Sequence, residues 1–287
     1  MAYGSPERLA DVPAYYADIR GGRPISPENL EDLVESYRRL GIEDSSPLNA
    51  ITERTRAALA GELGLPVYTG MKHWPPRIAE AAEAALADGA ERIVGLVLAP
   101  HYSALSIKGY RDQLEQAVAH RAELRFVDSW HNEPAFIDVL ADKVRGTDRH
   151  VVFTAHSLPE RVLAMGDPYQ DQLLETSRLV AERAALTEPW SFSFQSESPT
   201  GEPWLGPDIL DHLRELCSQG VERVLVCPVG FVSDHLEIRW DLDVEAKELA
   251  VELGLDLERI DMPNDEAPFV EALATIVRRE LSVPSPA

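Results

Sequence analysis

The sequence alternates between short apolar runs and longer helical segments along nearly its whole length. The runs at 92–98, 151–155 and 222–227 are rich in Val, Ile and Leu, and each ends close to a Pro or a His. A stretch with helical periodicity follows each of these regions. Strands that alternate with helices in this way form parallel sheets with helices on both faces. The sequence therefore predicts an α/β fold.

The pattern occurs twice. The segment DGAERIVGLVLAPHYS at 88–103 resembles QGVERVLVCPVGFVS at 219–233, and in both a strand starts after Gly and ends at a Pro-containing loop. The turn residues RGTDR separate the two halves. We expect two similar doubly wound lobes, residues 1–148 and 149–287, each with a four-stranded parallel sheet flanked by helices, and a cleft between them. Packing of the last helix against the first lobe is an alternative to its packing within the second.

Composition indicates which kinds of partner and which cellular compartment fit the chain. The formal net charge of −22 disfavours nucleic acid and anionic membrane surfaces. Cys217 and Cys227 supply neither a disulfide framework nor a C-x-x-C metal pair, which is typical of a reducing cytosol. No apolar run reaches the length of a membrane span, and the N-terminus lacks a signal-peptide pattern. We expect a soluble, cytoplasmic monomer with no membrane insertion.

Residues 234–249 contain a row of acidic side chains. On an α-helix starting at Asp234, five carboxylates share about a quarter of the surface: Asp234, Glu237, Asp241, Glu245 and Glu248. Like charges four residues apart destabilise an exposed helix, so the row suggests a bound cation. Oxygen ligands suit hard and borderline divalent metals. A solvated helix face with a capping box is the simpler explanation of the row on its own.

Histidines follow two of the predicted strands. In parallel sheets, ligands bind at the carboxyl ends of the strands, where we expect His101, His156 and the loop before Glu237. A His that faces a carboxylate provides both a metal ligand and a proton acceptor near neutral pH. A hydrogen-bonded structural His is the alternative. If the two lobes face one cleft, His156 and the acidic helix meet across it.

Three segments carry a family resemblance: TAHSLPE at 154–160, QSESPTGEPWLGPD at 195–208 and CPVGFVSDHLEIRWDLDVEAK at 227–247. They resemble the ferrochelatases, and most closely the coproporphyrin type of Gram-positive bacteria and actinobacteria. The similarity continues through YYADIRGGRP, SSPLNAIT and DSWHNEPAF. The resemblance implies insertion of the substrate Fe(II) into coproporphyrin III to give coprohaem, which a downstream coprohaem decarboxylase would consume.

The resemblance also implies which residues handle the metal. By the family pattern, His156 lies over the ring centre and shares with Glu237 the binding of iron and the uptake of pyrrole protons. We expect Glu237 to face His156 from the other lobe. Asp241 and Glu245 match the family's outer metal site, where they form either a relay for iron or a Mg²⁺ site.

Four further positions match residues that contact the porphyrin: Tyr3, Arg20, Ser46 and Tyr110. The resemblance implies that Tyr3 approaches the metal from the opposite face and that the other three hold propionates. Loop residues expected at the mouth of the cleft are Lys72, His73 and His101.

The chain departs from the family pattern at three places. Relatives have a strand upstream of the MAYG turn. Relatives of this type carry an arginine where this chain has Ser36, next to Tyr37. Some actinobacterial relatives hold a [2Fe–2S] cluster through cysteines near the C-terminus. Because no cysteine follows Cys227, we expect no iron–sulfur cluster here.

Several alternatives stay open. The nearest is a ferrochelatase that uses protoporphyrin IX. Tyr3 and the lack of an apolar membrane-anchoring lip favour coproporphyrin III, which has four carboxylates. A sirohydrochlorin or cobalt chelatase of the same fold would usually lack the SDHLE segment. A non-catalytic haem or metal carrier is the alternative from another class.

Overall fold

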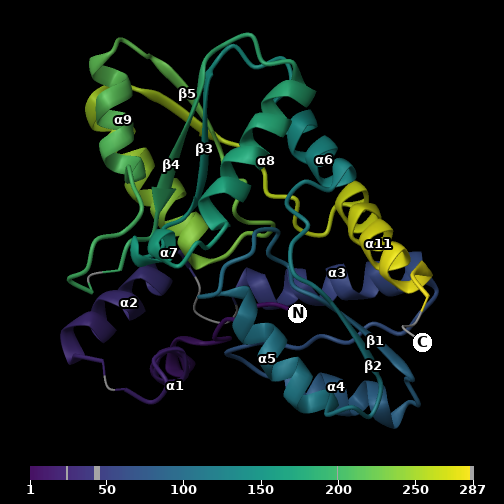
Figure 1. Ribbon diagram of the computed structural model, residues 1–287. Coiled ribbons are helices and arrows are strands. Elements are labelled where there is room, and N and C mark those ends of the chain that lie inside the picture. Colours follow the sequence, from purple (N-terminus) through teal and green to yellow (C-terminus); the bar gives the residue numbers. More distant parts are fainter. Residues whose placement is uncertain (24, 42–45, 199, 285–287) are drawn as a thin grey trace.

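A computed structural model describes residues 1–23, 25–41, 46–198 and 200–284. Within these ranges the chain forms two parallel sheets flanked by helices (Figure 1). The larger sheet has the strand order β4-β3-β5-β6. Its strands are β3 (His150–His156), β4 (Trp190–Gln195), β5 (Arg223–Cys227) and β6 (Asp256–Arg259). All of its strand pairs are parallel, as the alternation of strands and helices predicts.

Helices cover both faces of this sheet, and its central strand is fully buried. Residues 151–155 of β3 have no exposed surface, which explains why this segment is apolar without alternation. One face packs against α9 (Ile209–Ser218), η2 (Ile238–Ala246) and α10 (Lys247–Leu253). The other face packs against α6 (Pro134–Val144) and α8 (Tyr169–Ala184). The short helix α7 (Arg161–Ala164) lies beyond the end of β3.

The smaller sheet differs from the prediction of four strands. In the described residues it pairs only β1 (Arg92–Leu96) with β2 (Glu123–Val127). The N-terminal segment forms a single bridge between Ala2 and Met71, and the carbonyl oxygen of Met1 accepts a 2.8 Å hydrogen bond from Leu98. Gly4 ends this segment at φ 87°, where a Cβ would lie 2.6 Å from Trp74.

The helices of the N-terminal half fall into two groups. Those around the smaller sheet are α3 (Pro47–Leu63), α4 (Ile78–Ala87) and α5 (Ile107–Val118). Those that form a separate layer are η1 (Leu9–Asp11), α1 (Val12–Ile19) and α2 (Pro27–Arg39). In this layer Val12 and Tyr37 pack with Leu236, which directly precedes Glu237. The α1–α2 layer therefore borders the predicted site.

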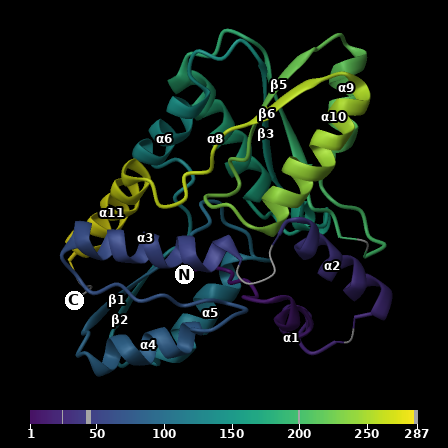
Figure 2. The ribbon, with the colours of Figure 1, turned by 180° about the vertical axis from the view of Figure 1, so that it is seen from behind.

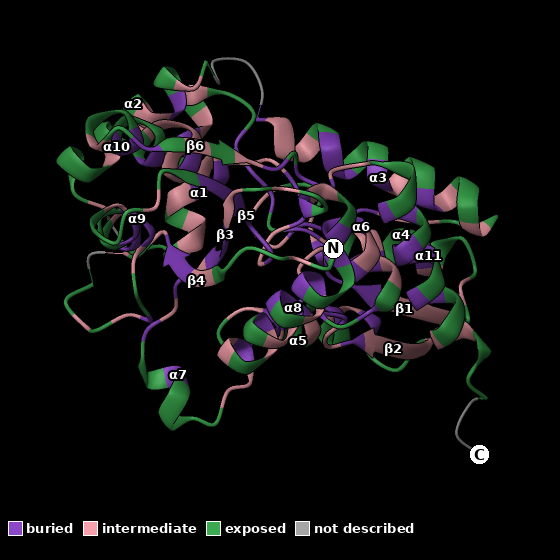
Figure 3. Ribbon diagram, turned by 90° about the horizontal axis from the view of Figure 1, so that it is seen from above, coloured by how far each residue is buried: buried purple, intermediate pink, exposed green. Residues whose placement is uncertain are grey.

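The last helix, α11 (Ala267–Ser282), packs against α3 and α6 (Figure 2). Its Phe269 joins Trp130 and Phe136 in a hydrophobic cluster that also includes Phe153 of the larger sheet. The view from above shows buried residues gathered between the helices and along β3, β4 and β5 (Figure 3). One continuous core thus links the sheets, and the division of the chain at residue 148 remains a proposal.

Candidate active site

The acidic segment forms a π-helix, η2, and not the α-helix expected from its sequence. Hydrogen bonds from i to i+5 give more than four residues per turn, compared with 3.6 in an α-helix. Side chains four residues apart, such as Asp241 and Glu245, therefore align more closely than in an α-helix. Asp234 lies outside the row, because it binds Arg259 at 3.2 Å and accepts a hydrogen bond from Asn264 at 2.9 Å.

His156 and Glu237 lie next to each other. His156 ends β3, and its Nε2 is 3.8 Å from Oε1 of Glu237. Its Nδ1 contacts the carbonyl oxygen of Ser157, which can only accept, so Nδ1 carries the proton. The lone pair of Nε2 is therefore free to bind a metal or to take a proton.

The predicted arrangement of this pair across the cleft is wrong. Both residues belong to the larger sheet, because His156 ends β3 and Glu237 begins the helix after β5. A flat ring between them would need about 7 Å, two van der Waals contacts of about 3.5 Å each. A separation of 3.8 Å leaves no such space, so a ring has to lie on one side of the pair.

A second histidine, His235, flanks Glu237 and was missed from the sequence. Its Nε2 is 3.6 Å from Oε2 of Glu237, and its Nδ1 donates to the carbonyl of Ser233. Burial raises the pKa of Glu237, but the positive charge that His156 carries once its Nε2 is protonated, together with His235, outweighs burial and lowers that pKa to about 2. The Glu237 side chain is 42% exposed, so this charged carboxylate faces open space. His235 could have been found from the sequence, because it lies in the SDHLE segment two residues before Glu237.

Asp241 lies one turn farther along η2 than Glu237, where polar residues at the end of β4 hydrogen-bond to it. The hydroxyl of Ser196 and Nε2 of Gln195, at 3.1 Å, donate hydrogen bonds to its Oδ2. Gln195 is itself held by Thr154 at 3.0 Å. Burial and the charge of Glu237 raise the pKa of Asp241 to about 7, despite these hydrogen bonds. Gln195 and Ser196 were not predicted, although both lie at the carboxyl end of a strand.

This raised pKa has a consequence for stability. The folded protein holds the Asp241 proton more tightly than the unfolded chain, whose pKa is near 3.8. The folded state therefore loses stability as pH rises from about 4 to about 7. Asp241→Asn avoids that loss, so we expect its unfolding midpoint to exceed that of wild type by about 2–5 °C at pH 8.

Thermal unfolding followed by circular dichroism at several pH values measures this difference. The gain should shrink steadily between pH 8 and pH 5. Asp171→Asn, at an exposed position in α8, is the control and should show no pH-dependent gain. A constant gain across the pH range would contradict the titration of Asp241.

Glu245 and Glu248 form the outer end of the row. Glu245 lies at the surface. Partial desolvation of its carboxyl group and the negative charges of Asp208 and Glu248 raise its pKa, and Trp240 opposes this rise. In the described part of the chain, no three His, Cys, Asp or Glu side chains are close enough together to hold a metal ion.

Tyr3 lies in the N-terminal half, near Glu237. Its ring centroid is 4.6 Å from that of His73, and burial and the charge of Glu237 both raise its pKa. The residue as a whole, backbone included, is 42% exposed. Nζ of Lys72 lies 5.0 Å from the ring centroid of Tyr110, which is buried in α5. The structure thus brings Tyr3, His73, Lys72 and Tyr110 into one neighbourhood.

The remaining predicted residues have different surroundings. Arg20 caps the C-terminus of α1 and is exposed, and its guanidinium makes no ion pair with any described residue. Ser46 is buried, and no described residue hydrogen-bonds its Oγ. His101 was expected at the cleft mouth, but it is 3% exposed and bonds Thr176 at 2.8 Å. His101 is therefore a packing residue.

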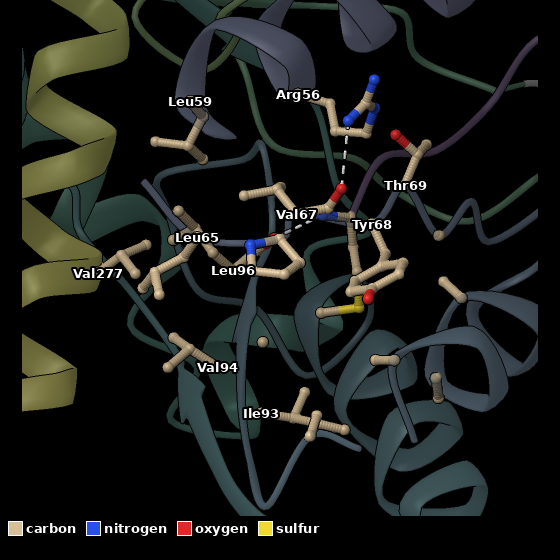
Figure 4. Close-up of a pocket in the computed structure, with 18 of the residues that line it drawn as sticks. Arg56, Leu59, Leu65, Val67, Tyr68, Thr69, Ile93, Val94, Leu96 and Val277 are labelled. Carbon is tan, nitrogen blue, oxygen red and sulfur yellow. Dashed lines mark hydrogen bonds between the residues drawn. The ribbon is translucent and has the colours of Figure 1, made fainter. Parts of the chain in front are cut away.

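A separate apolar cavity of about 420 Å³ lies beside the smaller sheet (Figure 4). Leu59 of α3, Val94 of β1 and Val277 of α11 line it, and Arg56 bonds the carbonyl of Val67 at 3.3 Å beside it. Among the described lining residues, none is a predicted site residue. The cavity is therefore distinct from the site around His156.

Comparison with known proteins identifies the family of this chain. The ferrochelatase family model matches residues 1–281. A ferrochelatase of Herpetosiphon aurantiacus is 43% identical over 296 residues, covering 96% of each chain. One of Deinococcus radiodurans is 42% identical over 299 residues, covering 98% of this chain and 94% of its own. A coproporphyrin III ferrochelatase of Halalkalibacterium halodurans is 41% identical over 300 residues, covering 98% and 96%.

Solved structures support the fold. SirB from Bacillus subtilis, solved with Fe³⁺, aligns with a TM-score of 0.60 at 12% identity, over 80% of this chain and 88% of its own. The described residues include no helix that is both long and apolar enough to span a bilayer. Taken with the matches in sequence and the site at the ends of β3 and β5, these findings show that the chain belongs to the ferrochelatase family, whose enzymes insert iron into a porphyrin.

Proposed function

We propose that this ferrochelatase inserts Fe(II) into coproporphyrin III and produces coprohaem. The observation that carries the proposal is the pair of His156 Nε2 and Glu237 Oε1, 3.8 Å apart at the carboxyl end of the larger sheet. A free imidazole lone pair beside a charged carboxylate suits both iron binding and proton uptake.

The reaction exchanges two pyrrole protons for one Fe(II) ion. His156 accepts a pyrrole proton at Nε2, and the negative charge of Glu237 stabilises the imidazolium that forms. His235, 3.6 Å from the same carboxylate, keeps Glu237 ionised. Because these groups interact closely, their proton affinities belong to the group as a whole, and the second proton is not assigned to one residue.

The ring is proposed to lie between this pair and Tyr3. Tyr3 is on the N-terminal segment and feels the charge of Glu237, which supports a position on the opposite face of the ring. Arg20 offers a guanidinium for bidentate binding of a propionate. Ser46 offers a buried hydroxyl that no described residue engages. Tyr110 would contribute to propionate binding next to Lys72, whose Nζ lies over its ring.

Iron is proposed to reach the pair along Glu245 and Asp241. Single carboxylates in sequence bind a dication weakly enough to release it, which suits transfer better than storage. A resident Mg²⁺ at Asp241 and Glu245 remains an alternative use of the same oxygens. Fe(II) is the metal substrate in this family.

The choice of coproporphyrin III rests on two kinds of support. Several relatives at about 40% identity carry that name, whereas the two most similar relatives reported above are named ferrochelatase alone. Coproporphyrin III has two more carboxylates than protoporphyrin IX, and Arg20 and Lys72 offer positive charge for them. A carboxylate bound to such groups contributes roughly 1.5 kcal/mol or more, which is about tenfold in affinity.

We therefore expect kcat/KM for coproporphyrin III to exceed that for protoporphyrin IX by about tenfold or more. Anaerobic iron insertion, followed by the loss of porphyrin fluorescence, measures both. Arg20→Gln should reduce the preference, whereas Arg23→Gln, on the same loop, should leave it unchanged. Equal or higher kcat/KM for protoporphyrin IX would identify that porphyrin as the substrate.

Two further expectations belong to this proposal. Coprohaem still carries propionates that a decarboxylase must convert, so such an enzyme is the expected downstream partner. We also expect a monomer, because both halves of the site lie in one chain. A non-catalytic carrier would need a ligand for iron, but not a charged carboxylate beside a free imidazole.

A further inference from the structure

The outer end of the acidic row is paired with an arginine from the other half of the chain. Arg39 is the last residue of α2, and its Nη2 lies 2.8 Å from Oε1 of Glu248 in the first turn of α10. The two residues are 209 positions apart in sequence. This ion pair therefore joins the α1–α2 layer to the helix that continues the acidic row.

Arg39 also contacts the helix that carries the row. Its Cζ lies 4.9 Å from the ring centroid of Trp240, a cation–π contact. The indole of Trp240 opposes the rise in the pKa of Glu245. Arg39 thus contacts the outermost carboxylate directly and also contacts an indole on the helix that carries the row.

The charges around Glu245 are unequal. Asp208 and Glu248 surround it with negative charge, and Arg39 supplies positive charge against them. The Arg39 and Glu248 side chains are 46% and 62% exposed, so both meet solvent. A dication arriving from solvent would meet these outer carboxylates before Asp241. It would compete there with the guanidinium of Arg39, which already pairs with Glu248.

We propose that Arg39 is the counter-ion of Glu248 and Glu245 and determines how tightly they hold the incoming metal. This inference rests on the proposed function, because it takes the row as the route of iron. A dication has to displace Arg39 from Glu248. The return of Arg39 then weakens the hold of the outer carboxylates and favours transfer to Asp241.

Neighbouring residues on α2 do not share this position. The hydroxyl of Ser36 bonds the carbonyl of Asp32, so it is committed to its own helix. Arg38 pairs with Glu35, also within α2. Arg38→Gln therefore removes the same charge from the same helix without affecting the row, and it is the matched control for Arg39→Gln.

The test is titration with Mn²⁺, followed by electron paramagnetic resonance, on the metal-free full chain at low ionic strength. We expect Arg39→Gln to bind Mn²⁺ about three- to fivefold more tightly than Arg38→Gln, with a smaller difference at high salt. Arg39→Lys retains the charge and should behave like wild type. Equal or weaker Mn²⁺ binding by Arg39→Gln would overturn the proposal.

A double variant locates the effect. Adding Glu248→Gln to Arg39→Gln should remove the gain in Mn²⁺ affinity, and a gain that persists would also overturn the role of Arg39. Iron insertion by wild type is measured in parallel. Failure of wild type to metalate porphyrin would refute the proposed function, whereas normal metalation with equal Mn²⁺ affinities would refute only the inference about Arg39.

Discussion

Replacing His156 with alanine is expected to lower the rate of iron insertion by about 10²–10⁴-fold, the range found when a general base is removed. Nε2 of His156 is the free imidazole nitrogen beside Glu237, so its loss removes both a metal ligand and a proton acceptor. Porphyrin binding should stay within about twofold of wild type, since a proton acceptor adds little to ground-state affinity. Porphyrin fluorescence gives the affinity, and single-turnover metalation gives the rate.

The control is His120→Asn. His120 is exposed after α5 and has a φ of 63°, a backbone conformation that asparagine tolerates. Its metalation rate should equal that of wild type. If His156→Ala metalates porphyrin at the wild-type rate, insertion does not depend on this imidazole, and a carrier with spontaneous metalation becomes the better explanation.

The second large effect is expected at Gly230, in the loop after β5. Its N–H donates to the carbonyl of Thr154 at 3.1 Å, and a Cβ there would lie 2.4 Å from Cβ of Ala155. Gly230→Ala must therefore push the loop away from the end of β3. We expect a loss of about 1–3 kcal/mol, which lowers the unfolding midpoint by about 3–8 °C.

The same shift should also slow iron insertion, because this loop fixes the distance between His156 and Glu237. Calorimetry and the metalation assay measure the two effects on one preparation. Gly61→Ala is the control: a Cβ at this exposed position in α3 meets nothing within 4 Å, so stability should be equal or higher. Wild-type stability and rate in Gly230→Ala would show that the loop does not set the geometry of the site.

The larger sheet was predictable because its strands are buried on both faces. The apolar runs at 151–155 and 222–227 correspond closely to β3 and β5. The smaller sheet was not, because the segment before Gly4 forms a single bridge to Met71 where a paired strand was expected. Its neighbour at Met71 accordingly forms only isolated bridges.

The site was predictable in part. The rule that ligands bind at the ends of parallel strands predicted that His156 and Glu237 would meet. It did not predict that both would belong to the larger sheet and lie 3.8 Å apart, because that depends on how the loop at Gly230 packs. The widened turn of η2 was missed because a spacing of 3.6 residues was assumed. The partners Ser196 and Arg39 depend on tertiary packing, which has no local signature.

The packing of α11 bears on how the chain can be synthesised. This helix comes last in the sequence, yet it covers α3 and α6 and places Phe269 between Trp130 and Phe136. While the ribosome is still translating the second half, the first half has emerged with an apolar flank uncovered. That flank is covered only after α11 has left the exit tunnel, so the N-terminal half cannot complete its core until α11 has been translated.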